Sequence, residues 1–260
     1  MKNYFDVSGK YALVMGASSG LGRQFALCLA EQGANVVIAA RRVDRLEEVR
    51  QEIEKYGVRC VVSPCDITDS SQVAATVNQM MEEFGRIDIL INNTGLASRL
   101  PAVEFDDDSW RQMMETNVNG LFYVAREVGK VMLKQGYGKI VNTGSIHCMV
   151  TMNGFPRAAY STTKGAINMM TKALASEWAK CGITVNTVGP GFFAMEMTAK
   201  DMNSENGEPT PYVKMVYNNC PMGRFGNPEE LNGIMLYFAS DASSYCTGQL
   251  MCVDGGWTIV

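Results

Sequence analysis

The chain has 260 residues, 47% of them apolar and 19% charged, so it is long enough to bury a full core and short enough to form one domain. Its 23 Lys and Arg against 27 Asp and Glu give a net charge of -4 without any block of like charge, which argues against nucleic acid as a partner. The one histidine, His147, and eight scattered cysteines without a C-x-x-C pair argue against a zinc site and favour buried free thiols.

Short β-branched runs alternate along the chain with segments of helical periodicity. The predicted strands are 11–15, 35–39, 60–63, 87–91, 138–143, 184–188 and 249–253. The predicted helices are 23–32, 43–56, 120–135 and 158–179. Such alternation is typical of βαβ units, so we expect an α/β fold over residues 1–260: a Rossmann-type doubly wound parallel sheet of about seven strands with helices on both faces. The loop-like stretch 203–211 predicts a substrate flap at about 192–220.

A glycine-rich turn joins the first predicted strand to the first helix. It reads Gly16-Ala17-Ser18-Ser19-Gly20-Leu21-Gly22, and such a strand–turn–helix aims backbone N–H groups and the helix dipole at a pyrophosphate. The spacing differs from the G-x-G-x-x-G of most dinucleotide folds, and a plain tight turn is the alternative. The expected dinucleotide contacts in this turn are Gly16, Ser18, Ser19, Gly20, Leu21 and Gly22.

The end of the second strand indicates which dinucleotide binds. An Asp or Glu there binds the ribose 2′-OH of NAD, whereas this chain has two alanines followed by Arg41 and Arg42. Two guanidinium groups suit a 2′-phosphate, so we expect NADP(H), with Arg41 as the primary contact. The alternative is that these arginines are solvated charges at a helix start, because Arg45 and its neighbours show that charge is common here.

The segment Tyr160-Ser161-Thr162-Thr163-Lys164 places a phenol and an ammonium one helical turn apart on one face. A neighbouring ammonium favours the phenolate and so suits the phenol to acid–base catalysis. With this motif the chain resembles the short-chain dehydrogenase/reductase family over nearly its whole length. The other matching motifs, in order, are Gly16…Gly20-x-Gly22, Cys65-Asp66, Asn92-Asn93-Thr94-Gly95, Asn117-Val118-Asn119-Gly120, Gly144-Ser145, Asn186…Pro190-Gly191 and Val253-Asp254-Gly255-Gly256.

The resemblance implies hydride transfer between a nicotinamide and a secondary alcohol or ketone. It makes Tyr160 the proton donor and Lys164 the residue that tunes Tyr160 and holds the nicotinamide ribose. Ser145 then orients the substrate oxygen, and Asn117 holds a water that relays protons. The further cofactor contacts that it implies are Asp66, Ile67, Asn92, Gly95, Pro190 and Gly191; for Asp66 and Asn92 a local turn cap is the alternative.

The chain departs from the family pattern at three positions. Met15 stands where the family usually has Thr and Thr94 where it has Ala, which suggests that a hydroxyl has moved to the opposing loop. Met195 replaces the Thr that commonly bonds the nicotinamide carboxamide, and Thr198 is the candidate substitute.

The substrate is expected to lie between the loop after Ser145, which is longer than is common in the family, and the flap. The expected contacts are Arg99, Ser145, His147, Met152, Phe155, Tyr160, Phe192 and Met197. Methionine suits bulky apolar ligands, which favours a hydroxysteroid or bile acid. The run 92–101 is instead similar to gluconate 5-dehydrogenases and related polyol or keto-acid enzymes, in which case Arg99 pairs with a substrate carboxylate. His147 is interpreted as a hydrogen-bonding wall residue rather than a catalytic one.

Two other functions stay open from the sequence. A 3-ketoacyl-thioester reductase shares every cofactor motif but needs a basic patch near the pocket, for which Arg99 and Arg157 make a thin one. A non-catalytic NADP-sensing protein is the alternative of a different class, and a broken Ser145, Tyr160 and Lys164 set would be its mark. Family analogy implies a homotetramer. Without a secretory h-region or a long apolar run, the protein is expected to be cytoplasmic with no membrane partner.

Overall fold

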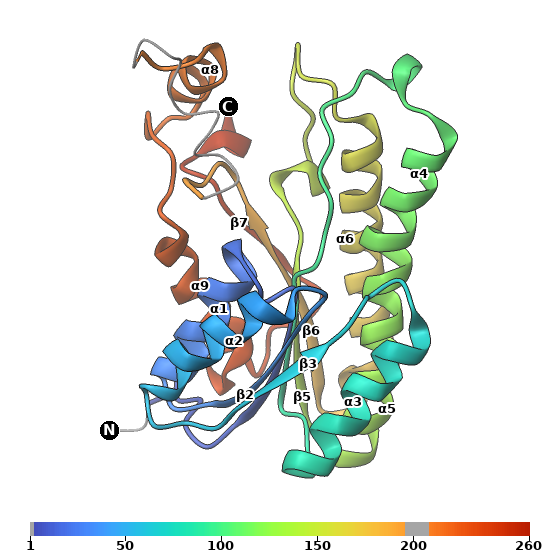
Figure 1. The fold of residues 1–260 in the computed structure, drawn as a ribbon. Helices are drawn as coiled ribbons and strands as arrows, with labels where there is room; N and C mark the ends of the chain where they lie inside the picture. The colour runs from blue at the N-terminus through green and yellow to red at the C-terminus, as the bar shows by residue number, and fades with distance from the viewer. Residues whose placement is uncertain (1–2, 196–207) are drawn as a thin grey trace.

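Seven parallel strands form one sheet in the computed structural model, which describes residues 3–195 and 208–260 (Figure 1). The strands are β1 (Tyr11–Met15), β2 (Asn35–Ala40), β3 (Cys60–Pro64), β4 (Ile89–Asn92), β5 (Gly138–Thr143), β6 (Ile183–Pro190) and β7 (Leu250–Val253). Their order across the sheet is β3-β2-β1-β4-β5-β6-β7, and every neighbouring pair is parallel. The expected Rossmann-type doubly wound sheet is therefore confirmed.

Helices cover both faces of the sheet (Figure 1). They are α1 (Gly20–Glu31), α2 (Val43–Glu54), α3 (Ser70–Phe84), α4 (Asp107–Met114), α5 (Leu121–Gln135), α6 (Ala158–Trp178), α8 (Pro211–Asn219) and α9 (Asn232–Ala239). One apolar cluster joins the sheet to α1, α2 and α9, and a second joins the other face to α3, α5 and α6. The strands are buried on both sides, which explains why they appear in the sequence as nearly continuous apolar runs.

A third, smaller apolar cluster lies above the carboxyl end of β7. It joins α8 to the segment after β6 and to the end of the chain, with Val213, Val216 and Phe225 buried and Phe192 and Trp257 packed against them. The Phe192 and Trp257 ring centroids lie 4.6 Å apart. This cluster fixes the described parts of the expected flap beside the carboxyl edge of the sheet, whereas residues 196–207 lie outside the described part of the chain.

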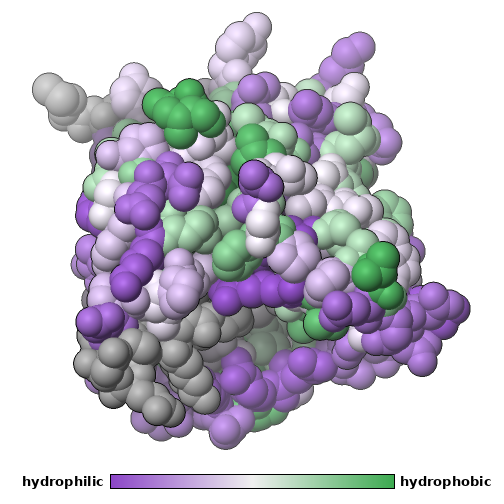
Figure 2. All heavy atoms as spheres, turned by 90° about the horizontal axis from the view of Figure 1, so that it is seen from above, coloured by the Kyte–Doolittle hydropathy of each residue, from purple (hydrophilic) through white to green (hydrophobic). Residues whose placement is uncertain are grey.

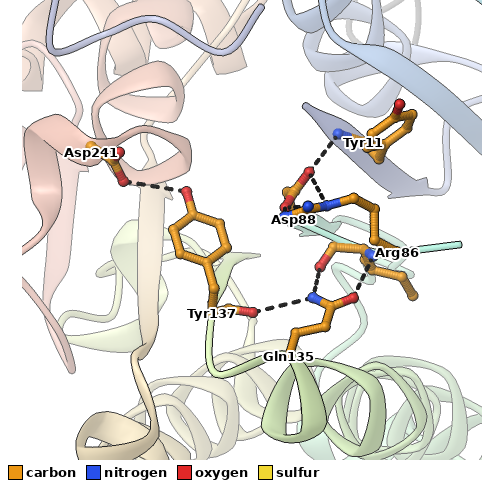
Figure 3. Close-up of polar contacts among 7 residues, drawn as sticks. Tyr11, Arg86, Asp88, Gln135, Tyr137 and Asp241 are labelled. Atoms are coloured by element: carbon orange, nitrogen blue, oxygen red, sulfur yellow. Dashed lines mark hydrogen bonds and ion pairs between the residues drawn. The ribbon is translucent and has the colours of Figure 1, made fainter. Parts of the chain in front are cut away.

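Paired polar groups close the opposite, amino edge of the sheet (Figure 3). The Asp88 carboxylate, with 1% of the residue exposed, accepts hydrogen bonds from Tyr11 N at 3.0 Å and from Arg86 Nη2 at 2.5 Å. The Tyr137 hydroxyl donates to Asp241 Oδ1 at 3.3 Å. The first contacts link β1 to the residue before β4, and the Tyr137 contact links the residue before β5 to the chain after α9. The polar groups at this edge therefore satisfy one another's hydrogen bonds.

Candidate functional site

A cavity of about 820 Å³ opens at the carboxyl edge of the sheet, within the size range of small-molecule sites. Figure 2 looks onto this edge and shows the hollow bordered by hydrophilic side chains. Strand order reverses beside β1, which pairs with both β2 and β4, and such a switch point is where doubly wound sheets bind ligands. The loops after β1, β2, β3, β4, β5 and β6 all contribute to its walls.

The glycine-rich turn forms one wall through backbone conformations that only glycine adopts readily. Gly16 and Gly20 have φ of +72° and +57°. A Cβ on Gly20 would meet only Met195 Sδ, at 3.9 Å, so the backbone is open to the cavity there. A Cβ on Gly22 would instead lie 2.2 Å from Gly16 O. Gly22 is therefore tightly packed under the turn, and its expected cofactor contact stays a prediction. Gly16, Ser18, Ser19, Gly20 and Leu21 line the cavity.

The N-terminus of α1 faces this cavity without a cap. Its N-cap residue, Ser19, makes no side-chain capping hydrogen bond, and the first turn holds no acidic residue. By contrast, the Asp69 carboxylate caps α3 and the Asp106 carboxylate caps α4. Uncapped N–H groups and a positive helix end form an anion site, so the donors present fit the diphosphate of a dinucleotide.

Three arginines gather where the adenosine ribose of a dinucleotide would lie. Arg42 Nη2 donates to Ser18 Oγ at 3.0 Å and to Ser19 Oγ at 2.7 Å, which holds this guanidinium over the glycine-rich turn. The Arg41 side chain is 70% exposed and lies 3.9 Å from the Asp66 carboxylate. Arg45, from the first turn of α2, also lines the cavity. Arg45 was expected to be an ordinary surface charge. Its position three residues after Arg42, one helical turn along α2, is the signal that could have placed it at the cavity.

The adenine end of the cavity is formed by the loops after β3 and β4. Asp66 and Ile67 line it, and Asp66 Oδ1 accepts hydrogen bonds from the backbone and hydroxyl of Thr68 at 3.0 and 2.8 Å. Asn92 does not line the cavity, because its buried amide donates to Leu121 O at 2.9 Å behind the wall. The next residue, Asn93, lines the cavity, and the expected place of Asn92 beside the cofactor stays a prediction.

The structure also places the three residues that depart from the family pattern. A Cβ on Gly16 would lie 3.0 Å from Thr94 Oγ1, so the Thr94 hydroxyl does face the glycine-rich turn across the cleft. Met15 is buried in the core, and Met195 lines the cavity. Thr198 lies outside the described residues.

Ser145, Tyr160 and Lys164 come together on the cavity wall. Tyr160 and Lys164 lie in the first two turns of α6, and the Lys164 ammonium donates to Thr143 O at 2.9 Å and lies 5.6 Å from the Tyr160 ring centroid. The Ser145 hydroxyl accepts a hydrogen bond from His147 N at 3.2 Å, so its own proton remains available to another acceptor. Pro190 and Gly191, as well as Gly95, line the same region.

Asn117 lies one layer behind this wall, in a π-helical segment, Glu115–Gly120, that connects α4 to α5. Its amide accepts from Leu96 N at 2.7 Å and donates to Leu96 O at 2.9 Å and to Thr163 Oγ1 at 3.0 Å. Single π-turns inside helices are frequent at functional sites. Here the extra residue turns Asn117 toward α6, where it fixes the loop after β4. The expected role of Asn117 in holding a water stays a prediction.

The substrate end of the cavity holds two arginines and several aromatic rings. Arg99, Arg157, Phe192 and Tyr212 line it. The Arg99 guanidinium carbon lies 4.4 Å from the Tyr212 ring centroid, in cation–π geometry. Phe155 does not line the cavity but packs 5.7 Å from the Tyr212 ring, and Met152 is buried away from it. The expected substrate contacts of Phe155 and Met152 stay predictions, and Met197 lies outside the described residues. Arg157, expected only as part of a basic patch near the pocket, and Tyr212 also line the substrate end.

His147 lines the cavity beside Tyr160, with ring centroids 5.6 Å apart in edge-on geometry. Burial, together with the Arg157 charge, lowers the pKa of His147 to about 4. Its Nδ1 lies 3.2 Å from Val150 O, which can only accept, so the proton of the neutral ring sits on Nδ1 and Nε2 is an acceptor. A neutral imidazole here is suited to hydrogen bonding with a hydroxyl group.

Residues 3–195 and 208–260 contain neither a candidate metal site nor a candidate membrane-spanning helix. No group of three or more His, Cys, Asp or Glu is placed to hold a metal ion. No described helix has both the length and the apolar character needed to cross a membrane.

Comparisons with known proteins agree with this geometry. The sequence model of a family described as enoyl-(acyl carrier protein) reductase matches residues 16–258. A gluconate 5-dehydrogenase of Gluconobacter oxydans is 38% identical, with 98% of this chain and 97% of the relative covered. A short-chain type dehydrogenase/reductase from Mycobacterium marinum superposes with a TM-score of 0.93 at 38% identity, covering 99% and 98% of the two chains. A gluconate 5-dehydrogenase from Burkholderia cenocepacia, solved in complex with NADP and tartrate, superposes with a TM-score of 0.91 at 33% identity and the same coverage.

Proposed function

The chain belongs to the short-chain dehydrogenase/reductase family, and on this premise we propose that it interconverts a secondary hydroxyl and a ketone on a sugar acid of the gluconate type, with NADP(H) as cofactor. It is an oxidoreductase acting on CH–OH groups, as the family match and the named relatives show. The sugar-acid substrate is the step beyond family membership, and the electrostatics of the cavity support it.

The charge of the substrate end carries this proposal. Arg99 and Arg157 line it beside Tyr160, and Lys164 lies next to them. Among the described residues that line the cavity, the one carboxylate is Asp66, at the adenine end. A wall on which the described residues supply cations and no facing carboxylate favours an anionic substrate, and a guanidinium binds a carboxylate in a bidentate pair. Sugar acids carry that carboxylate on a short chain of hydroxyl groups.

The bulky apolar substrate expected from the methionine-rich loop is not supported. Met152 lies outside the cavity wall, and the described substrate end is cationic as well as aromatic. The sensing alternative is also not supported, because Ser145, Tyr160 and Lys164 line one wall as an intact set. The similarity to gluconate 5-dehydrogenases agrees with the sugar-acid alternative.

Cofactor binding is assigned to residues on three walls of the cavity. The N–H groups at the start of α1 would hold the diphosphate, and Arg41, Arg42 and Arg45 would hold the 2′-phosphate. Asp66 and Ile67 would flank the adenine, while Pro190 and Gly191 would lie against the nicotinamide. When bound, NADP(H) supplies or accepts the hydride.

The residues around the substrate oxygen move and hold its proton. During reduction, the Tyr160 hydroxyl donates its proton to the carbonyl oxygen, and Ser145 donates a hydrogen bond to the same oxygen. Lys164, fixed by Thr143 O, lies beside Tyr160 and would hold the nicotinamide ribose. In the oxidative direction the phenolate takes the proton back.

The proposal is tested by a turnover screen of the purified protein with sugar acids, bile acids and ketoacyl thioesters, each with NADP(H) and NAD(H). We expect turnover of a gluconate-type acid with NADP(H) and at least ~10-fold lower kcat/KM for the other classes. Turnover confined to a bile acid or a ketoacyl thioester would overturn the sugar-acid assignment. Tight NADPH binding without any turnover would instead favour the sensing function.

Two expectations accompany this function. We propose that residues 192–220 act as a substrate flap, supported by Phe192 and Tyr212, which line the cavity from its two described parts. The homotetramer and the cytoplasmic location rest on family analogy and sequence composition and stay predictions.

A further inference from the structure

Arg157 is a half-buried guanidinium for which the described residues provide no ion-pair partner. It immediately precedes α6 and lines the cavity, and its Nε has no hydrogen-bond partner among the described residues. Two other arginines of the described chain have ion-pair partners: Arg86 pairs with Asp88, and Arg224 pairs with Glu230. A buried donor left unsatisfied costs free energy, more so when it is charged. An arginine kept in that state at a cavity wall indicates that its partner comes from outside the protein.

The electrostatics around Arg157 point to an anion. Burial lowers the pKa of Arg157, and the neighbouring charge of Arg99 lowers it further. Because a guanidinium does not lose its proton in proteins, the two positive groups persist in one cavity and repel each other. The nearby His147 is held neutral and brings no compensating charge. A carboxylate bound between the two arginines would relieve both the repulsion and the missing hydrogen bond.

The position of Arg157 also limits where that anion lies. Its guanidinium carbon is 5.5 Å from the Tyr160 ring centroid, and Arg99 approaches from the Phe155 and Tyr212 side. A group bound here is therefore close to the oxygen that Tyr160 protonates. A carboxylate held close to the reacting oxygen suits a short acid rather than one with a remote carboxylate.

We propose that Arg157 is a specificity-determining residue that binds the substrate carboxylate beside Tyr160, jointly with Arg99. This inference rests on the sugar-acid function proposed above and assigns its recognition to a residue that the motifs do not mark. Binding the carboxylate at Arg157 selects acids over neutral polyols.

The test compares Arg157→Gln with wild type on an acid and on a neutral substrate. D-gluconate and a neutral hexitol of the same length are oxidised with NADP. We expect Arg157→Gln to raise KM for gluconate roughly 10- to 100-fold and to leave the hexitol within about 3-fold, because only the acid loses a charge-assisted pair. Arg157→Lys should recover part of the loss, since it keeps the charge but not the bidentate geometry.

Arg126→Gln is the matched control. Arg126 lies on α5 outside the cavity wall, and its guanidinium carbon is 5.5 Å from the Tyr123 ring centroid, the same distance that separates Arg157 from the Tyr160 ring. This variant removes a cation–π contact and an ion pair with Glu127 but no cavity cation, and it should leave the kinetics with both substrates unchanged. Calorimetric binding of gluconate to the enzyme–NADPH complex, which cannot react, measures recognition apart from turnover and should weaken in Arg157→Gln by the same factor.

Three results would contradict the role of Arg157 in binding the substrate carboxylate. If Arg157→Gln lowers kcat equally for gluconate and hexitol, Arg157 acts on Tyr160 rather than on a carboxylate, and the inference is wrong. An unchanged KM and unchanged gluconate binding in a folded variant overturn it too. If wild type itself neither binds nor oxidises any sugar acid, the proposed function fails, and this inference fails with it.

Discussion

The two edges of the sheet differ in whether their polar groups are hydrogen-bonded to other groups of the described chain. At the amino edge, the buried Asp88 carboxylate is paired with Arg86, and the Tyr137 hydroxyl donates to Asp241 (Figure 3). At the carboxyl edge, the first turn of α1 has no side-chain cap, and Arg157 Nε has no partner among the described residues. Polar groups that satisfy one another stabilise the fold, whereas groups left open at a cavity are those that a ligand satisfies.

This contrast explains why catalytic and structural side chains of the same type behave differently. Tyr137, just before β5, and Tyr160, on α6, both carry a phenol. Burial, together with Asp241, raises the pKa of Tyr137, so that its hydroxyl is a fixed hydrogen-bond donor. Tyr160 instead lines the cavity beside the Lys164 ammonium. The account therefore predicts that changes at one edge alter turnover and that changes at the other alter stability.

The largest effect is expected for Tyr160→Phe. Loss of the phenolic proton should lower kcat roughly 1,000-fold or more, while NADPH binding, measured by fluorescence titration, stays within about 2-fold. Tyr137→Phe is the matched control, because it removes a hydroxyl at the amino edge and should leave kcat unchanged. A Tyr160→Phe variant with a normal rate would rule out the proposed acid–base role.

Asp88→Asn is expected to act on stability alone. It leaves the half-exposed Arg86 guanidinium and the Tyr11 amide without their ionised acceptor. Losing charge-assisted hydrogen bonds of this kind should lower the free energy of unfolding by about 2 kcal/mol. The measurement is urea denaturation, with kcat recorded on the same preparation. Asp108→Asn removes an exposed partner of Arg111 and should cost little. A changed kcat in Asp88→Asn, with stability intact, would break the contrast between the edges.

Arg41→Asp should reverse the charge that faces the 2′-phosphate. We expect the ratio of kcat/KM for NADPH over NADH to fall roughly 30-fold, because a carboxylate repels the phosphate and accepts from a ribose hydroxyl. Arg111→Asp, on the exposed face of α4, serves as the control for net charge. An unchanged ratio would show that Arg42 and Arg45 hold the phosphate without Arg41.

The smallest effect is a pH dependence of stability from His147. Its pKa is about 4 in the folded protein against 6.5 for the free side chain, so the unfolded chain binds the proton more tightly. The contribution of His147 is therefore fully present above pH 6.5 and is lost as the pH falls toward 4, amounting to about 1 kcal/mol between pH 7 and pH 5.5. His147→Gln should remove that part of the slope in denaturation curves, and an identical slope in both proteins would contradict the neutral ring.

The sequence predicted the parts of the fold that follow from local pattern. β1 and β5 occur at the predicted residues, because buried parallel strands are continuous apolar runs between turn residues. The helices α3, α4, α8 and α9 were not named in the prediction. Three of them, α4, α8 and α9, have only 8, 9 and 8 residues, too few to show a clear helical period. Within the site, Ser145, Tyr160 and Lys164 were predicted by spacing and by the family resemblance, and the structure brings them together.

The remaining parts of the site depend on geometry that sequence spacing does not carry. Successive residues in a strand point to opposite faces, so Asn92 at the end of β4 faces inward while Asn93 reaches the cavity. Arg157 and Tyr212 are far apart in the chain and meet only because the loop after β5 and α8 pack over the same edge. No motif marks them. Arg157 becomes visible from its burial and from an Nε without a partner among the described residues, and Tyr212 from its place on the cavity wall.

The most direct test of the central claim, that the carboxyl edge keeps its cations for an acidic substrate, is NADPH oxidation by the wild-type protein with 5-keto-D-gluconate and with a neutral ketose of the same length. The account predicts a kcat/KM for the keto acid at least ~10-fold above that for the neutral ketose. Equal values for the two, or turnover of the neutral ketose alone, would contradict it.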